Sequence, residues 1–297
     1  MFLQRTTVKC LGLLSIIVLL SSASSQQPVA PAQKKENDRS IIADDFLKNR
    51  PAKPKPGRKK LLPTTYRLAT PPTKPFYRAK LQVGVTIWRF EPGMAGSFNG
   101  ERSASRNYWN KADWTPRRVE ADVKFRQGDH LRISIESPRD GYLYVVNRDL
   151  LADGTYGDTN LIFPTQGEDN RLKAGKLIDI PAQDDPPFKA DPKPDQSSEL
   201  LTVIVTSAPL QLRLGPKAIP ISKEQLSEWE HRWGGEADRL EMNGGAGLVR
   251  TPEEQLAASP TGSRQLTRED PMPQTIYSLV PKDADGLLFN LVLSYVR

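Results

Sequence analysis

Residues 127–165 constrain the fold more than any other stretch, because they alternate strand patterns with tight turns. Residues 131–136 alternate apolar and polar side chains, which is the period of a β-strand. A turn at 140–141 follows, and residues 142–146 are apolar on both faces, as expected of a central strand. A second Asp-Gly turn stands at 153–154. The stretch therefore predicts a β-domain.

Two of the predicted strands are expected to have one face in water. In residues 131–136 the polar positions are taken by Arg132, Ser134 and Glu136. Residues 81–88 repeat the alternation, with Leu, Val and Ile on one face only. Such a pattern is typical of a sheet that packs on a core with one side and meets solvent with the other.

The remaining pattern predicts a single all-β domain of the sandwich type, which spans residues 80–297. Residues 91–116 are rich in Gly and Ser and form a long loop. Few helices are expected between the strands, which excludes a parallel α/β sheet. Further strands are predicted over 119–125, 161–163, 176–180, 200–206, 275–280 and 287–295.

One helix is predicted to pack on this sandwich. It begins at Ser222, because Ser222 and Gln225 have the spacing of a capping box. A second short helix is expected over 252–258. The apolar face of the first helix consists of Leu226, Trp229 and Trp233.

Residues 1–25 have the order of a secretory signal peptide, with basic residues, an apolar run over 11–20 and then small residues. The run is too short to span a membrane, since a transmembrane helix needs about 20 apolar residues. Cys10 is the only cysteine. Cleavage after the signal would leave a chain without a thiol or a disulfide. We therefore expect export to the periplasm, the outer surface or the medium, with cleavage of the signal left open.

Residues 26–79 are predicted to be a disordered spacer rich in Lys and Pro, because they hold too little apolar surface to offset the entropy of ordering. Ile41, Ile42, Phe46 and Leu47 are the one apolar cluster inside it. They form either a short docked helix or a transient turn, and the small number of apolar residues favours the turn. We expect contact with a membrane only through the signal peptide or this polybasic spacer.

The net charge of +7 is unevenly distributed. Residues 28–80 contain 14 Lys and Arg against 4 Asp and Glu, whereas residues 81–297 contain 26 against 31. The predicted domain is thus acidic, which argues against a nucleic-acid partner, because a nucleic-acid footprint requires basic charge on the folded surface.

No pattern for catalysis, metal binding or a cofactor is present. The histidines His130 and His231 are not joined by the cysteines or further histidines of a zinc site, and we expect ordinary structural roles for both. Nucleophile and phosphate-loop motifs are missing. Asp149, Asp153 and Asp158 leave calcium open, although the turn explains Asp153. The acids at 184, 185, 191 and 195 are expected to be solvated.

An aromatic cluster gives the best lead to a ligand. Tyr108, Trp109 and Trp114 occupy the long loop, and exposed rings on a sandwich can stack on sugars or peptides. The alternative is that they cover the sheet, which is favoured because Trp is buried on average.

Five stretches of the chain resemble an uncharacterised bacterial domain-of-unknown-function family, four-three-eight-four in that series. The family occurs in envelope proteins and is appended to caspase-like peptidases and to serine/threonine kinases, domains that this chain lacks. The resemblance implies an extracytoplasmic β-rich accessory module and transfers no catalytic residue. The matching stretches are GDHLRISIESPRDGYLYVVNRD (128–149), ADGTYGDTNLIFPT (152–165), KAGKLIDIPAQDD (173–185), LSEWEHRWG (226–234) and REDPMPQTIY (268–277).

These observations favour a non-enzymatic binding or accessory module of the bacterial cell envelope. Its partner is expected to be another protein or a cell-wall polymer. Two alternatives stay open: a hydrolase that uses paired carboxylates on envelope glycans or peptides, and a purely structural envelope protein.

Overall fold

The computed structural model of the chain describes residues 40–53, 80–93, 114–260, 264–283 and 285–296. All of them belong to one compact unit that extends from Arg39 to Arg297. The predicted signal peptide, Tyr108 and Trp109 lie outside the described residues.

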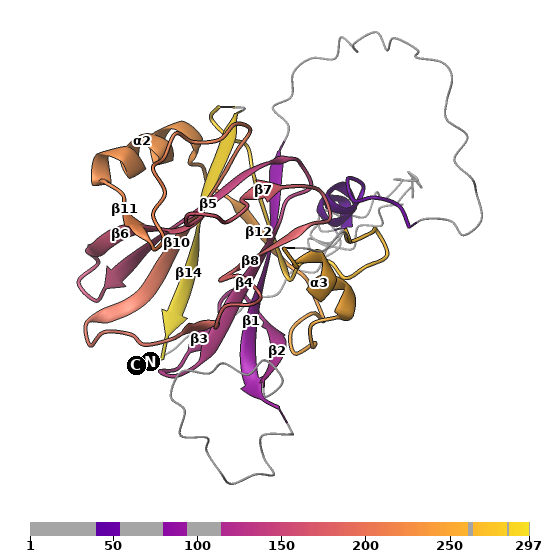
Figure 1. Cartoon of the computed structure of the whole chain (residues 1–297), viewed down its shortest axis with the longest axis horizontal. Coiled ribbons are helices and arrows are strands. Elements are labelled where there is room, and N and C mark those ends of the chain that lie inside the picture. Colours follow the sequence, from indigo (N-terminus) through magenta and orange to yellow (C-terminus); the bar gives the residue numbers. More distant parts are fainter. Residues whose placement is uncertain (1–39, 54–79, 94–113, 261–263, 284, 297) are drawn as a thin grey trace, which may run out of the picture. The chain divides into compact units, whose positions relative to one another are not determined.

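Two β-sheets form this unit, each with seven strands in the described ranges (Figure 1). Sheet A has the strand order β12-β13-β1-β4-β8, with β2 beside β1 and β9 beside β4. Its strands are β1 (Leu81–Pro92), β2 (Trp114–Val119), β4 (His130–Glu136), β8 (Leu177–Ile180), β9 (Phe188–Lys189), β12 (Asp238–Glu241) and β13 (Thr275–Leu279).

Sheet B has the strand order β11-β6-β5-β10-β14-β3, with β7 beside β5. Neighbouring strands in both sheets are antiparallel, except that β3 pairs parallel with β14. The strands of sheet B are β3 (Lys124–Phe125), β5 (Gly141–Leu151), β6 (Tyr156–Phe163), β7 (Arg171–Leu172), β10 (Gln196–Thr206), β11 (Ile219–Pro220) and β14 (Gly286–Tyr295).

The main hydrophobic core lies between the two sheets, so the predicted all-β sandwich is confirmed. Alternate residues of the long strands enter it, such as Ile133 of β4 and Val203 of β10. In β14 the predicted apolar face is buried as expected: Leu287, Phe289, Leu291, Leu293 and Tyr295. Burial of each such side chain stabilises the fold by on the order of 1.5–3 kcal/mol.

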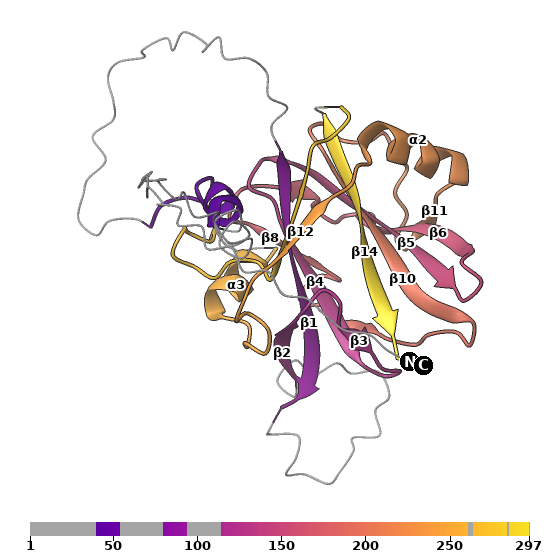
Figure 2. The same cartoon turned by 180° about the vertical axis from the view of Figure 1, so that it is seen from behind.

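Helix α2 (Lys223–Trp233) covers the outer face of sheet B, as Figure 2 shows from behind. The Ser222 hydroxyl accepts a hydrogen bond from the Gln225 backbone N–H at 3.1 Å, which confirms the predicted N-cap. Leu226, Trp229 and Trp233 pack on the side chains of β5, β10 and β14 that point away from the main core. Within the described ranges, no helix is both long and apolar enough to cross a membrane.

The prediction that sheet A meets solvent on one face is wrong. Arg132, Ser134 and Glu136 of β4 are buried, and so is the outer face of β1 around Trp88. Alternation in a sequence separates two faces of a strand but does not reveal whether the polar face meets water or a second layer of protein. Here a second layer covers it.

Part of this cover comes from residues predicted to be disordered. Residues 40–47 are helical, and Phe46 is 0% exposed in a small cluster with Leu240 and Ile276. Gly84 of β1 makes room for it, because a Cβ there would lie 2.9 Å from the Phe46 ring. For residues 40–53 the expectation of disorder over 26–79, and of a transient turn at the apolar cluster, is therefore wrong. Composition does not show that Phe46 packs against Leu240 and Ile276.

The long loop predicted over 91–116 is also shorter at both ends. Residues 91–92 extend β1, and Trp114 begins β2, where it pairs with Pro92. The strand predicted over 119–125 is divided by a turn at 121–122 into the end of β2 and the short β3.

Candidate functional site

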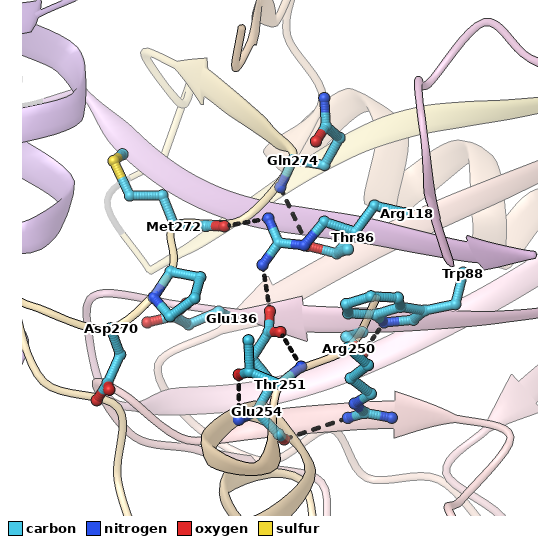
Figure 3. Close-up of polar contacts among 12 residues, drawn as sticks. Thr86, Trp88, Arg118, Glu136, Arg250, Thr251, Glu254, Asp270, Met272 and Gln274 are labelled. Atoms are coloured by element: carbon cyan, nitrogen blue, oxygen red, sulfur yellow. Dashed lines mark hydrogen bonds and ion pairs between the residues drawn. The ribbon is translucent and has the colours of Figure 1, made fainter. Parts of the chain in front are cut away.

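The outer face of sheet A carries a layer of buried charged side chains, which we call the polar layer. Its strand residues alternate with the main core, and the segments that cover it supply the opposite charges. Figure 3 shows part of it. The charged members of the polar layer are Arg50, Arg118, Arg132, Glu136, Asp179, Arg250 and Glu254.

Arg50 binds Glu136 in the first of three ion pairs in this layer. The Arg50 Nε and Nη2 atoms donate to the two Glu136 carboxylate oxygens, each at 2.7 Å. Three backbone carbonyls, of Thr267, Asp270 and Pro271, accept the remaining N–H groups at 3.0–3.2 Å. All five guanidinium donors are therefore satisfied. Burial raises the pKa of Glu136, and the bonds from Arg50 oppose that shift.

Arg118 of β2 forms the second pair, with Glu254 of α3 (Pro252–Ala257). Its Nη1 atom also donates to the Met272 carbonyl at 2.6 Å (Figure 3). Glu254 is positioned by the capping box of α3, because its carboxylate accepts from the Thr251 backbone N–H and its own N–H donates to the Thr251 hydroxyl. The predicted second helix thus delivers a carboxylate to sheet A.

Arg250 forms the third pair, a bidentate contact with Asp179 of β8 at 2.7 and 3.0 Å. Asp179 also accepts from the Ser134 hydroxyl at 2.6 Å, and Ser134 in turn accepts from the Trp88 indole N–H at 2.8 Å. The guanidinium groups of Arg118 and Arg250 lie 5.4 and 5.3 Å from the Trp88 ring centre. These bonds fix the orientation of the side chains at the centre of the layer.

Arg132 is the one arginine of the polar layer that has no carboxylate within ion-pair distance among the described residues. It is 2% exposed, and its Nη2 atom donates to the Asp185 backbone carbonyl at 2.6 Å. Its buried Nε has no acceptor. Desolvation lowers the pKa of Arg132, and the charge of Asp179 partly offsets this. Among the described residues the polar layer has four arginines and three carboxylates, so the charge of Arg132 is not matched by a direct ion pair. The carboxylates of Asp184 and Asp185 also raise the pKa of Arg132, but they form no ion pair with it.

A pocket of about 280 Å³ opens beside this unmatched charge. The Arg132 guanidinium lies over the Phe90 ring, 5.4 Å from its centre. Trp114 is the first residue of β2, and its ring centre is 4.8 Å from that of His130. The pocket is lined by Phe90, Trp114, Thr115, Pro116, Arg132, Gln183, Val249, Arg250 and Gln255. Aromatic walls and a buried cation together can bind an anion with an apolar part.

Of the three aromatic residues predicted to bind a ligand, the structure places only Trp114. It lines the pocket and is half-buried, and its role as a ligand contact stays a prediction. Tyr108 and Trp109 lie outside the described residues. His130 contacts Trp114 at the pocket's edge, and His231 is exposed on α2.

Of the acids considered from the sequence, Asp184 and Asp185 lie near Arg132, because the Asp185 carbonyl accepts from it and both carboxylates raise its pKa. Asp149 binds Lys193 at 2.6 Å, and Asp153 accepts from Thr155 within its turn. In the part of the chain that the structure describes, no group of three or more His, Cys, Asp or Glu side chains could hold a metal ion. The acids at 184, 185, 191 and 195 are exposed.

The pocket's charged residues are not apparent from the sequence. Arg132 has the position of a solvated strand residue, and Arg250 lies in a region without periodicity. One local signal exists, since Thr251 and Glu254 have capping-box spacing next to Arg250. It predicts the helix but not the face on which the helix lies.

Comparison with known families adds one observation. Residues 124–209 match the family model "Domain of unknown function (DUF4384)". The resemblance inferred from the sequence is confirmed for this segment. The DUF4384 segment runs from β3 to just beyond β10, and it contains Arg132, Glu136 and Asp179. Trp114, Arg250 and Glu254 lie outside it. No curated protein and no solved structure matches the chain.

Proposed function

We propose that the chain is an exported, non-enzymatic binding module of the bacterial cell envelope, and that its ligand site is the pocket beside Arg132. The observation that carries the proposal is a buried arginine that forms no ion pair with any described carboxylate and lines an aromatic pocket. A buried charge is destabilising unless an opposite charge pairs with it, so an anionic ligand would provide the missing partner of Arg132.

The state of the buried carboxylates supports a binding role over a catalytic one. Glu136, Asp179 and Glu254 are buried, and each accepts hydrogen bonds from an arginine, so their oxygens are already engaged within the fold. A general acid or base needs a pKa near the working pH and access to substrate. These three residues serve as partners of cations instead.

Export rests on the signal pattern of residues 1–25, and the envelope location on the family resemblance. The partner is then another protein or a wall polymer that presents a small anionic group. The polybasic residues before the domain would hold the module near an anionic surface.

A calorimetric titration with a defined panel tests the proposal. The panel contains small carboxylic acids, N-acetylated amino sugars and short peptides with acid or amide ends. We expect at least one class to bind, and Trp114→Ala to weaken that binding by roughly threefold to tenfold or more through lost ring contact. Tyr156→Ala removes an exposed ring on sheet B and is the matched control. Failure of every class to bind, or equal binding by Trp114→Ala, would contradict the proposal.

Two further assays separate the alternatives. Hydrolysis of envelope glycan or peptide that is lost in Asp184→Asn/Asp185→Asn would favour the carboxylate-dependent hydrolase. Retention on isolated cell wall that depends on residues 28–80 but not on Trp114 would favour a structural envelope protein.

A further inference from the structure

We infer that the pocket beside Arg132 recognises the terminal carboxylate of a peptide whose last residue is small and apolar. This inference rests on the proposed binding function and specifies its ligand class. It is argued from the charge of the polar layer, the donors that Arg132 has left, and the size and walls of the pocket.

The charge balance of the polar layer fits an anion with a single charge. The pairs of Arg50 with Glu136, Arg118 with Glu254 and Arg250 with Asp179 each sum to zero. Arg132 therefore contributes one positive charge that has no ion-pair partner among the described residues, although the exposed carboxylates of Asp184 and Asp185 raise its pKa. A bound carboxylate would pair with that charge directly. A doubly charged phosphate would leave a net negative charge in a region of low dielectric, which is unfavourable.

The two arginines of the pocket differ in the partners they already have. The Arg132 Nη2 donates to the neutral Asp185 carbonyl, and the buried Nε atoms of Arg132 and Arg250 have no acceptor among the described residues. Both Nη atoms of Arg250, however, are engaged by Asp179. Arg132 is thus the arginine whose guanidinium has no carboxylate partner there, and charge-assisted bonds to a carboxylate are among the stronger ones in proteins.

The volume and walls of the pocket limit what accompanies the carboxylate. A volume of about 280 Å³ lies just below the usual range for pockets that hold drug-sized ligands, so only the end of a larger molecule would enter. Phe90, Trp114 and Val249 offer apolar contact to a small side chain. Gln183 and Gln255 add neutral amide groups, which suit a peptide bond better than a second charge.

The test compares N-acetyl-L-alanyl-L-alanine with its C-terminal amide, by calorimetric titration of the full chain. We expect the acid to bind and the amide to bind at least about tenfold more weakly, since the amide cannot pair with the Arg132 charge. The D-configured peptide acid distinguishes a wall peptide from a protein terminus as the source. Inorganic phosphate is the probe for a doubly charged anion.

Arg132→Gln should reduce affinity for the acid at least about tenfold, to the level of the amide. The matched control is Arg171→Gln, which removes an exposed arginine on sheet B and should leave the affinity unchanged. Thermal melting shows whether each variant folds. If Arg132→Gln does not fold, Val249→Trp provides a second variant, because Val249 is exposed and a larger ring there would obstruct the pocket.

Several outcomes would overturn the inference. Equal binding of acid and amide would exclude carboxylate recognition and leave the binding function standing if Trp114→Ala still weakens it. Tighter binding of phosphate than of the peptide acid would exclude the preference for one charge. Binding that survives both Arg132→Gln and Val249→Trp would place the carboxylate elsewhere.

Discussion

Arg50 shows how one side chain can fix a segment to a sheet. Its five donors all reach acceptors, and two of those bonds go to the buried Glu136. Loss of a single partner from such a pair leaves a buried charge without compensation, which costs more than the pair contributes.

Arg50→Met should therefore lower the free energy of unfolding by about 3–5 kcal/mol. Urea denaturation followed by tryptophan fluorescence measures the loss. The control Lys48→Met breaks an exposed pair with Asp45 and should cost less than about 1 kcal/mol. The double variant Arg50→Met/Glu136→Met should recover much of the stability, because no lone charge stays behind. Additive losses in the double variant would show that the charge is not the cause.

His130 gives a prediction for pH. Burial lowers the pKa of His130, with a further lowering from Lys189 and an opposing effect of Asp129. The folded protein thus binds this proton less readily than the unfolded chain does. The contribution of His130 to stability is present above the unfolded value of about 6.5 and is lost as the pH falls through the folded value.

We expect His130→Gln to reduce the loss of stability between pH 7.5 and pH 5. Urea denaturation of variant and parent at both pH values gives the difference. His231→Gln changes the exposed histidine of α2 and serves as the control. The reasoning is wrong if His130→Gln and His231→Gln have the same effect.

Among the elements, α2 depends on a local signal that its sequence already contains. Ser222 caps its first turn, and the apolar stripe ends at Trp233, whose indole N–H donates to Asp285 at 2.9 Å. Its position on sheet B follows from that stripe, because the outer face of β5 is apolar as well.

Ser222→Ala should lower stability by about 1 kcal/mol, since the capped N–H group loses its acceptor. Ser227→Ala is the same substitution on the exposed side of the same helix. It should be neutral or slightly stabilising, because Ala has the higher helix propensity. Thermal melting of the two variants, measured in parallel, separates the cap from the propensity; equal shifts would contradict the capping role.

The elements that the sequence predicts are those with local causes. The strands around 131–136 and 142–146, the β14 face and both helices follow from periodicity, caps and turns. The prediction that Arg132 and Glu136 face solvent was wrong. Burial of that face of sheet A depends on contacts between residues more than 70 positions apart in the sequence. Trp114 was found as a ligand candidate only by its residue type.

At the scale of the whole molecule, the sandwich and its outer cover form one unit. Residues 40–53 contribute Phe46 and Arg50 to that cover, although they precede β1 by a long interval of sequence. The domain is therefore expected to depend on residues that composition assigns to a spacer.

A chain that starts at Lys80 should be less stable than one that starts at Arg39 by at least about 3 kcal/mol, since it loses Arg50 and leaves Glu136 unpaired. Urea denaturation of both chains measures the difference. The chain that starts at Arg39 and carries Glu136→Met should be less sensitive to removal of residues 39–79. Equal stability of the two chains would show that residues 40–53 only rest on the surface.

The sequence distances within the polar layer also bear on how the protein acquires its structure. Arg50 and Glu136 are 86 residues apart, Arg118 and Glu254 are 136 apart, and Arg50 and Asp270 are 220 apart. Contacts of such separation slow folding, because the entropy of closing a long loop is lost before the contact can form and stabilise the chain. Glu136 is synthesised long before Asp270 and Pro271, so the cover of sheet A can close only after residues 250–271 have been made. A nascent chain that ends before residue 250 would leave Arg118 and Asp179 without their partners Glu254 and Arg250, so residues 250–271 decide when these charges become paired and covered.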